Sequence, residues 1–218
     1  MYCLLPLTSF SNKLPSNYDN AARFYDHLSR LVYGETLVKA QTHFLHLIPA
    51  NAKVLIAGGG TGRILEEITK IHPSGLSIAY AEVSEKMIAL ARQRKVGENE
   101  VSYINMPVED VKLQPDFDVV ITPFLLDSLS PDSFNIVFKH LHNLLKPSGL
   151  WLNTDFQLTG KWWQPLLLKS MYLFFKTIGC VENVDLPLIK KHFADYGYIT
   201  IEEQTFFGEF VAATVYSK

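Results

Sequence analysis

The chain has 218 residues, of which 48% are hydrophobic and 19% charged, which suits one α/β domain and excludes disordered, collagen-like and coiled-coil chains. Twenty Lys and Arg residues against 22 Asp and Glu residues leave a formal net charge of −2, so no basic excess indicates a nucleic-acid partner. Two cysteines, Cys3 and Cys180, cannot form a disulfide framework and favour a reducing, cytoplasmic setting.

The hydrophobicity pattern predicts no stable membrane insertion. The N-terminal MYCLLPLTSF has no basic region and is too short and broken for a secretory signal. The most apolar later stretch, residues 165–181, is interrupted by Lys169 and Lys176 and falls short of the roughly 20 apolar residues that a span needs. Contact with a membrane surface stays open.

The predicted elements begin with helical periodicity over 16–48, broken at Gly34 and ended by Pro49. Strands and helices then alternate. Parallel strands are expected at 53–57, 76–81, 101–105, 118–122 and 150–154. Helices are expected at 64–71, 84–94, 131–145, 162–177 and 186–196. The last strands, 198–206 and 210–216, alternate more clearly and are expected to pair antiparallel around Gly208.

This order predicts an α/β fold with a doubly wound, mostly parallel seven-stranded sheet and an antiparallel C-terminal hairpin. No internal repeat, low-complexity tract or linker divides the chain, so residues 1–218 are expected to form a single domain. Its expected parts are N-terminal helices at 16–48, a ligand-binding core at 52–155, a helical insertion at 160–197 and the hairpin at 198–217.

A glycine-rich loop, Gly58-Gly-Gly60-Thr-Gly62, lies where the first buried strand turns into a helix. Residues without a Cβ let a ligand approach the backbone closely, and N–H groups at the helix start favour an anionic group. The dinucleotide fingerprint G-x-G-x-x-G does not fit, because its third glycine would be Arg63, and the phosphate loop G-x-x-x-x-G-K-[ST] is absent. The alternative is a tight turn that serves packing alone.

An acidic residue, Glu82, ends the second predicted strand, 20 residues after Gly62. Ligands bind at the carboxyl edge of an open parallel sheet, and a carboxylate there can accept hydrogen bonds from both hydroxyls of a ribose. Glu82 is therefore a candidate for holding a nucleoside, with a solvated glutamate at a strand end as the alternative.

With its G-x-G-x-G loop, and with Glu82 followed by Ser84 and Met87, the sequence resembles the class I S-adenosylmethionine-dependent methyltransferases of the small-molecule type, such as the quinone-biosynthesis methyltransferases. The resemblance covers nearly the whole chain and implies a helical lid at 16–48, with S-adenosyl-L-methionine as cofactor. The cofactor-binding residues that it implies are Gly58, Gly59, Gly60, Gly62, Glu82, Val83, Met87, Met106, Pro107, Val108, Phe124 and, in the lid, Tyr25.

The sequence departs from the family pattern at two positions. Ile56 stands where most members have an acidic residue that helps to hold the methionine end, and Arg63 is a candidate to replace it. Pro107 stands where most members have an acid near the adenine. The triple glycine preceded by Ile56 is also similar to aminopropyl (polyamine) transferases, and a non-catalytic nucleoside-binding module is a third hypothesis.

The expected acceptor of the methyl group is a small molecule that is apolar or aromatic. Asp127 and Asp155 follow the fourth and fifth strands and are candidates to position or deprotonate it. Leu125, Trp162 and Trp163 are candidates to line its pocket, while a core or dimer-facing helix is the alternative for the segment after Gly160. His43 and His46 have no acidic or cysteine companion, so we predict no metal site. A homodimer remains open.

Overall fold

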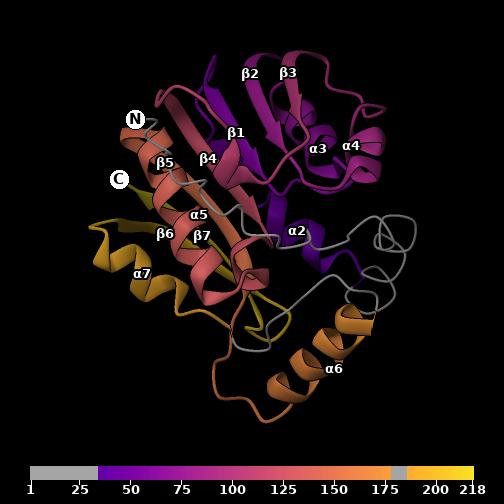
Figure 1. The fold of residues 1–218 in the computed structure, drawn as a ribbon, viewed down its shortest axis with the longest axis vertical. Helices are drawn as coiled ribbons and strands as arrows, with labels where there is room; N and C mark the ends of the chain where they lie inside the picture. The colour runs from indigo at the N-terminus through magenta and orange to yellow at the C-terminus, as the bar shows by residue number, and fades with distance from the viewer. Residues whose placement is uncertain (1–33, 178–185) are drawn as a thin grey trace, which may run out of the picture.

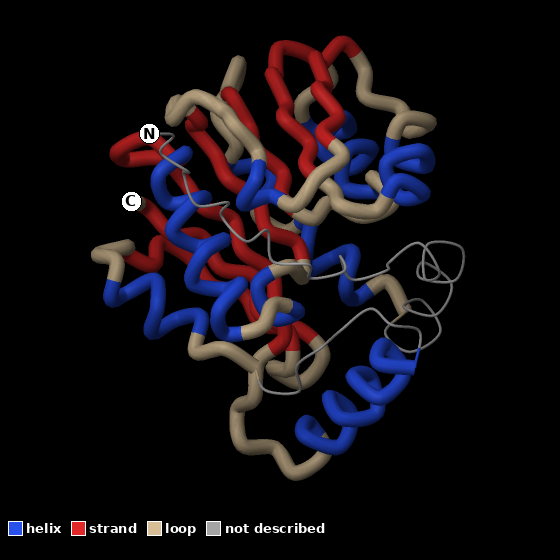
Figure 2. Tube along the Cα trace, viewed as in Figure 1, coloured by secondary structure: helices blue, strands red, loops and turns tan. Residues whose placement is uncertain are grey.

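The computed structural model describes residues 34–177 and 186–218, which build one seven-stranded sheet with helices on both faces (Figures 1 and 2). The strands are β1 (Lys53–Ala57), β2 (Ser74–Ala81), β3 (Glu98–Ile104), β4 (Phe117–Pro123), β5 (Leu145–Phe156), β6 (Ile199–Phe206) and β7 (Val211–Ser217). The helices are α2 (Thr36–Thr42), α3 (Arg63–Ile71), α4 (Glu85–Ala91), α5 (Pro131–Leu144), α6 (Gln164–Thr177) and α7 (Ile189–Asp195), with short 3-10 turns η2 (Leu45–Leu47), η3 (Val108–Asp110) and η4 (Leu126–Ser128). Residues 16–33 of the expected lid, including Tyr25, and both cysteines lie outside the described residues.

The strand order β3-β2-β1-β4-β5-β7-β6 confirms the predicted fold class. β1 lies at the centre of the parallel part, between β2 and β4, so that Ile56 is in register with Tyr80 on one side and Ile121 on the other. Because β2 and β4 both run parallel to β1, the carboxyl ends of the three strands lie at the same edge of the sheet.

β1 is apolar and buried from Val54 to Ala57, because it packs against helices on both faces. Leu55 and Ala57 join the core under α5 and α7, while Val54 and Ile56 join the core under α3 and α4. In the first of these cores the rings of Phe138 and Trp151 stack with their centroids 4.9 Å apart. The predicted strand at 53–57 is confirmed, and beyond the exposed Lys53 neither of its faces is exposed.

The alternation expected in the C-terminal hairpin is absent. β7 is buried at every position from Val211 to Tyr216, whereas β6 is exposed over its first six residues. The reason is the strand order, because the last strand inserts between β5 and β6 and leaves β6 at the edge. The antiparallel pairing itself is as predicted.

A third apolar cluster lies beyond the carboxyl end of β5, where α2 and α6 meet the start of β7. Its buried members are Leu37, Ala40, Phe156, Leu168, Tyr172, Phe210 and Val211. α6 stands away from the sheet at the edge of the molecule (Figure 1).

Candidate active site

The glycine-rich loop leaves β1 at the carboxyl edge of the sheet and needs glycine for two different reasons. Gly58, Gly60 and Gly62 all have left-handed backbones, with φ of 68°, 64° and 79°, a region that costs other residues about 1–2 kcal/mol. A Cβ on Gly60 would stand in the open, with the Met87 sulfur 3.9 Å away as its nearest neighbour. Gly60 therefore leaves bare backbone on the side where a ligand can approach.

The other glycines are required by packing. A Cβ on Gly59 would lie 2.3 Å from the ring of Tyr80, and one on Gly62 would lie 2.6 Å from the Cα of Ala91 in α4. Gly62 was expected to admit the ligand to the backbone, but the absence of its side chain lets α3 and α4 come together. Glycine is thus needed for packing at Gly59 and Gly62, while at Gly60 it leaves the backbone open.

Glu82 lies next to this loop, as the sequence suggested. Its Oε2 accepts a hydrogen bond from the Gly60 N–H at 3.0 Å and its Oε1 accepts one from the Ser84 N–H at 2.9 Å. The residue is 6% exposed, and Asn105 donates to the carbonyl groups of both Glu82 and Val83 at 3.0 and 2.9 Å. The carboxylate is therefore held in one orientation at the rim.

Two residues that support this corner were not singled out from the sequence. The Tyr80 hydroxyl donates to the Gly60 carbonyl at 2.9 Å, and Asn105 joins the ends of β2 and β3. Only Asn105 had a signal, since it opens the loop that the resemblance aligns with the adenine. Tyr80 reads as one more apolar residue of a buried strand.

The residues expected around an adenine lie on α4 and η3. Ser84 caps α4 by accepting from the Met87 N–H at 3.2 Å, which fixes the buried Met87 beside Gly60. On the other side Pro107 precedes η3, Val108 is buried and Met106 is 40% exposed. The two groups flank the rim near Glu82 from successive strands, β2 and β3.

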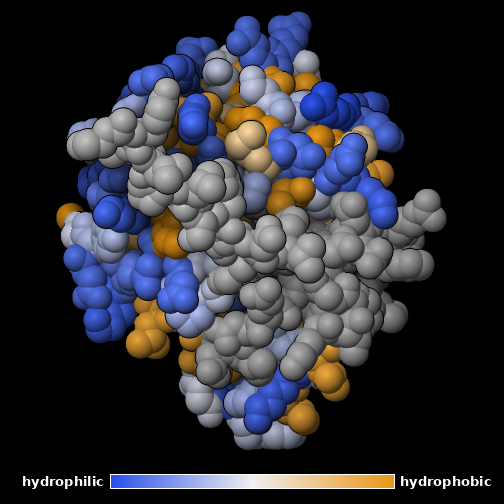
Figure 3. Space-filling model, viewed as in Figure 1, coloured by the Kyte–Doolittle hydropathy of each residue, from blue (hydrophilic) through white to orange (hydrophobic). Residues whose placement is uncertain are grey.

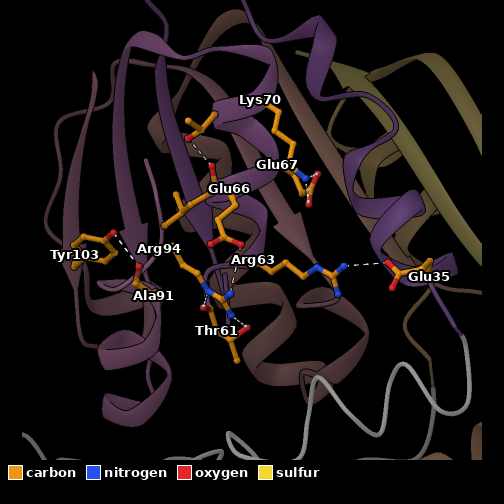
Figure 4. A network of polar contacts seen from close by, with 11 residues as sticks. Glu35, Thr61, Arg63, Glu66, Glu67, Lys70, Ala91, Arg94 and Tyr103 are labelled. Carbon is orange, nitrogen blue, oxygen red and sulfur yellow. Dashed lines mark hydrogen bonds and ion pairs between the residues drawn. The ribbon is translucent and has the colours of Figure 1, made fainter. Parts of the chain in front are cut away.

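The two positions considered for holding the methionine end of the cofactor, Ile56 and Arg63, have different surroundings. Ile56 is fully buried in the core under α3, so no polar group replaces the family's acid in that strand. Arg63, at the start of α3, reaches Glu35 just before α2, with 3.0 Å between Nη2 and Oε2 (Figure 4). Arg94, shortly after α4, contacts the glycine loop instead, with its Nε donating to the Thr61 carbonyl at 2.9 Å.

The tip of β4 closes the other side of the glycine loop. Phe124 has a left-handed backbone, with φ of 55°, and its N–H donates to the Thr154 carbonyl of β5 at 2.7 Å. This turn directs Leu125 back onto the loop, where its Cδ1 would lie 3.0 Å from a Cβ on Gly58. The surrounding structure thus holds Phe124 in a left-handed conformation that is unfavourable for a residue with a side chain.

Asp127 and Asp155 come together, but inside the protein. They are 6% and 3% exposed, and the Phe156 N–H donates to Asp127 Oδ2 at 3.4 Å. Neither oxygen of Asp155 meets a hydrogen-bond donor in the described part of the chain. Burial raises the pKa of Asp127 to about 6, and burial together with the neighbouring Asp127 carboxylate raises the pKa of Asp155 well above its usual range.

The two tryptophans after Gly160 are separated by the structure. Trp163 packs into the third cluster, with its ring 5.7 Å from Phe210 and 5.9 Å from Phe207. Trp162 is 85% exposed and directs its side chain away from that cluster. The cluster continues to the rim through Phe156, whose ring lies 5.0 Å from that of Phe124.

The described residues provide neither a metal-binding cluster nor a membrane-spanning helix. No group of three or more His, Cys, Asp or Glu side chains in residues 34–177 and 186–218 is arranged to hold a metal ion. Within the same ranges, no helix combines the length and the apolar character needed to pass through a bilayer.

Comparison with known proteins points to one kind of enzyme. The family model described as a methyltransferase domain matches residues 54–149. A ubiquinone/menaquinone biosynthesis C-methyltransferase from Geotalea daltonii is 27% identical over 179 residues, 79% of this chain and 73% of the relative.

Solved structures share the fold at lower identity. A 1,6-didemethyltoxoflavin-N1-methyltransferase from Burkholderia thailandensis, with 1,6-didemethyltoxoflavin and S-adenosylhomocysteine bound, has a TM-score of 0.62 at 16% identity, over 99% of this chain and 93% of its own. A magnesium protoporphyrin IX methyltransferase from Synechocystis, with S-adenosylhomocysteine bound, has a TM-score of 0.66 at 15% identity, over 92% and 94%.

Proposed function

We propose that this chain, a class I S-adenosylmethionine-dependent methyltransferase whose residues 54–149 match the methyltransferase-domain model, transfers the methyl group to a small apolar or aromatic acceptor. The proposed cofactor site is the rim formed by Gly58, Gly60 and Glu82. The observation that carries the cofactor site is the pair of hydrogen bonds from the Gly60 and Ser84 N–H groups to Glu82. They bring the bare backbone and the acid to one point.

The residues at this rim fit a nucleoside. A carboxylate accepts hydrogen bonds and ribose hydroxyls donate them, so a Glu82 fixed in orientation binds the sugar without first losing side-chain freedom. The open side of Gly60 leaves room at the backbone, and the proposed neighbours of the base are the apolar residues Met87, whose sulfur lies 3.9 Å from a Cβ on Gly60, and Val108. Val83, Met106 and Pro107 complete this part of the proposed site.

The bound cofactor supplies an electrophilic methyl group on a sulfonium, and the positive charge on sulfur is lost as the methyl group leaves. The chain's task is therefore to align the acceptor and to exclude water. Phe124 and Leu125 are placed for this, because the strained turn after β4 presses Leu125 against Gly58. An apolar wall at this point favours the loss of charge.

The aromatic cluster beside Phe124 supports an apolar or aromatic acceptor. Phe156, Trp163 and Phe210 form a continuous set of ring contacts that begins at the β4 tip. Relatives whose names specify quinone biosynthesis, a toxoflavin precursor or a protoporphyrin support the same class. Trp162, which points to solvent, has no part in the proposed wall.

Asp127 and Asp155 are proposed to position this wall rather than to deprotonate the acceptor. Both carboxyl groups are buried, and Asp127 accepts a hydrogen bond from the Phe156 N–H through its side chain and one from the Tyr172 hydroxyl through its carbonyl, at 3.2 Å. Asp127 thus joins η4, the end of β5 and α6 behind the aromatic rings.

Calorimetric titration with S-adenosylmethionine and S-adenosylhomocysteine tests the cofactor site, using the wild-type chain and Glu82→Gln. The amide keeps one acceptor but sets an NH2 against a backbone N–H, so we expect at least tenfold weaker binding and a loss of about 1–3 kcal/mol in the free energy of unfolding.

Asn99→Ala is the matched control. Asn99 is buried at the opposite end of β2 and β3, where it accepts from the Leu76 N–H and donates to two carbonyl groups. Its loss is expected to lower stability by a similar amount and to leave cofactor affinity unchanged. Equal affinities of wild type and Glu82→Gln would show that the ribose is held elsewhere.

Turnover assays on phenols, quinols and amines then test the reaction. Cofactor binding without turnover on any of them would favour the nucleoside-binding module, for which the buried Ile56 is the motivating observation. Turnover of the decarboxylated cofactor with an amine, and not of S-adenosylmethionine, would favour aminopropyl transfer.

A further inference from the structure

α6 presents an apolar face to solvent as well as to the protein. Trp162, Leu166 and Leu173 are 85%, 67% and 66% exposed. Spaced by four and seven residues, they lie along one side of the helix and the turn that leads into it. Three large apolar side chains in one exposed row differ from the single exposed apolar residues that are normal on a protein surface.

This face cannot turn inward, because the opposite face of α6 is already packed. Gln164, Leu168 and Tyr172 are 0%, 5% and 5% exposed, and the latter two belong to the cluster with Phe210. The Tyr172 hydroxyl and the Gln164 amide also bond to η4 and to the β6–β7 turn. The orientation of the helix is thereby fixed, with the row outside.

The position of α6 leaves the row accessible. The helix stands away from the sheet at the edge of the molecule (Figure 1), and hydrophobic side chains stand out in the same place on the space-filling surface (Figure 3). An extended flat surface can therefore approach this edge along the helix axis.

The charges around this face favour an anionic partner. Residues 157–177 contain Lys161, Lys169 and Lys176 and no Asp or Glu. Lys161 pairs with Glu209 at 3.2 Å, while Lys169 lies exposed within the row and has no ion-pair partner in the described part of the chain. By contrast, an exposed apolar pair on β6, Ile199 and Ile201, is followed at once by two glutamates.

We propose that α6 docks flat on an anionic lipid bilayer, with Trp162, Leu166 and Leu173 in the interface and Lys169 against the lipid headgroups. An amphipathic helix with a tryptophan at one end and an exposed lysine, Lys169, in its apolar row has the composition of helices that lie in the plane of a membrane. Lysine can extend its charged end towards the headgroups while its stem stays on the apolar surface. Docking in this way is independent of which acceptor the enzyme methylates.

Cosedimentation of the full chain with vesicles tests this docking. Vesicles of phosphatidylcholine with about a third phosphatidylglycerol are compared with phosphatidylcholine alone, and the lipid probe is the vesicle itself. We expect binding to the anionic vesicles that is at least tenfold stronger than to the neutral ones and that weakens with added salt.

Three variants separate the contributions. Leu166→Ser with Leu173→Ser is expected to weaken vesicle binding at least tenfold, and Lys169→Glu to weaken binding to the anionic vesicles severalfold. Ile199→Ser with Ile201→Ser removes two equally exposed apolar side chains from the acidic β6 edge and is expected to change nothing. Titration with S-adenosylhomocysteine, unchanged in all of them, shows that they are folded and keeps this test separate from that of the proposed function.

Absence of binding to anionic vesicles would overturn the proposal, as would equal binding by wild type and the leucine variant. Self-association of the wild type that the leucine variant abolishes, without vesicle binding, would assign the face to a second copy of the chain instead.

Discussion

Glu82 shows how one side chain serves both the fold and the site. Its two oxygens accept from the N–H groups of Gly60 and Ser84, so it holds the glycine loop and the start of α4 in place while presenting a carboxylate at the rim. A ligand that meets this carboxylate finds it already oriented, and less freedom is lost on binding. The same hydrogen bonds also stabilise the folded protein.

The buried pair Asp127 and Asp155 is the other notable feature at the residue scale, and it predicts an unusual dependence of stability on pH. Both pKa values are raised, that of Asp127 to about 6 from 3.8. Between about pH 4 and pH 6 the folded protein therefore binds more protons than the unfolded chain, and stability falls as the pH rises. For Asp127 alone the loss is on the order of 3 kcal/mol.

Asp155→Asn tests this dependence by urea unfolding between pH 4.5 and pH 8. The amide imitates the protonated acid, so the variant is expected to match wild type at the acidic end and to be more stable at the alkaline end. A difference that stays the same at every pH would contradict the raised pKa values of the pair.

Asp118→Asn is the matched control. Although partial burial opposes it, hydrogen bonds from Lys146 and Lys53 hold the pKa of Asp118 below its usual value. Its stabilisation is present above the unfolded value and is lost on acidification, so this variant is expected to be less stable than wild type at pH 8 and to approach it at low pH.

Among the elements, the loop between β1 and α3 joins two requirements in five residues. Gly60 leaves open space beside Met87, whereas Gly62 lets the backbone of α4 pass within contact distance of α3. The G-x-G-x-G spacing therefore meets a requirement of helix packing, at Gly62, and leaves the backbone open at Gly60.

Gly60→Ala and Gly62→Ala are expected to separate these requirements. An alanine at position 60 costs about 1–2 kcal/mol of stability through its left-handed backbone and places a methyl group on the ligand side, so cofactor affinity should fall at least tenfold. At position 62 the methyl group meets the Cα of Ala91, so stability should fall by more than at position 60 while the folded fraction binds nearly normally. Urea unfolding and calorimetry measure the two effects, and the reverse assignment would contradict them.

At the scale of the whole molecule, the insertion of β7 between β5 and β6 makes the last strand an interior strand of the sheet. It pairs with β5 from Val211 to Ser217 and with β6 on its other side, and it is buried nearly throughout. β6 can therefore join the sheet only when residues 211–217 have formed β7 beside β5.

A chain that ends at Phe210 is expected to lose cooperative thermal unfolding, as judged by near-ultraviolet circular dichroism, because β5 and β6 are left without their shared neighbour. Appending a short Gly-Ser tail after Lys218 is the control and is expected to have no effect. Native-like cooperative unfolding of the shortened chain would show that β7 is dispensable.

Local patterns were enough to predict most elements and the main ligand hypothesis. Apolar runs, glycines and prolines located β1, β2 and β4 to within one or two residues. The glycine loop and Glu82 follow neighbouring strands, which predicted that they would meet, and the Gly60 N–H does donate to Glu82. This worked because strands of a parallel sheet bring their carboxyl ends to one edge, so sequence position implies spatial position.

Other features depended on which residues far apart in the chain come together. The full burial of β7, the packing of Gly62 on Ala91, the pairing of Arg63 with Glu35 and the outward direction of Trp162 have no local signature. The burial of Asp127 and Asp155 is of the same kind, since a carboxylate after a strand is solvated or buried according to what covers it. Sequence by itself thus determined most of the helices and strands and the sheet edge proposed for the ligand, because these follow from backbone geometry and local hydrophobicity. Tertiary structure alone decided what each side chain meets there, because that depends on contacts between distant segments.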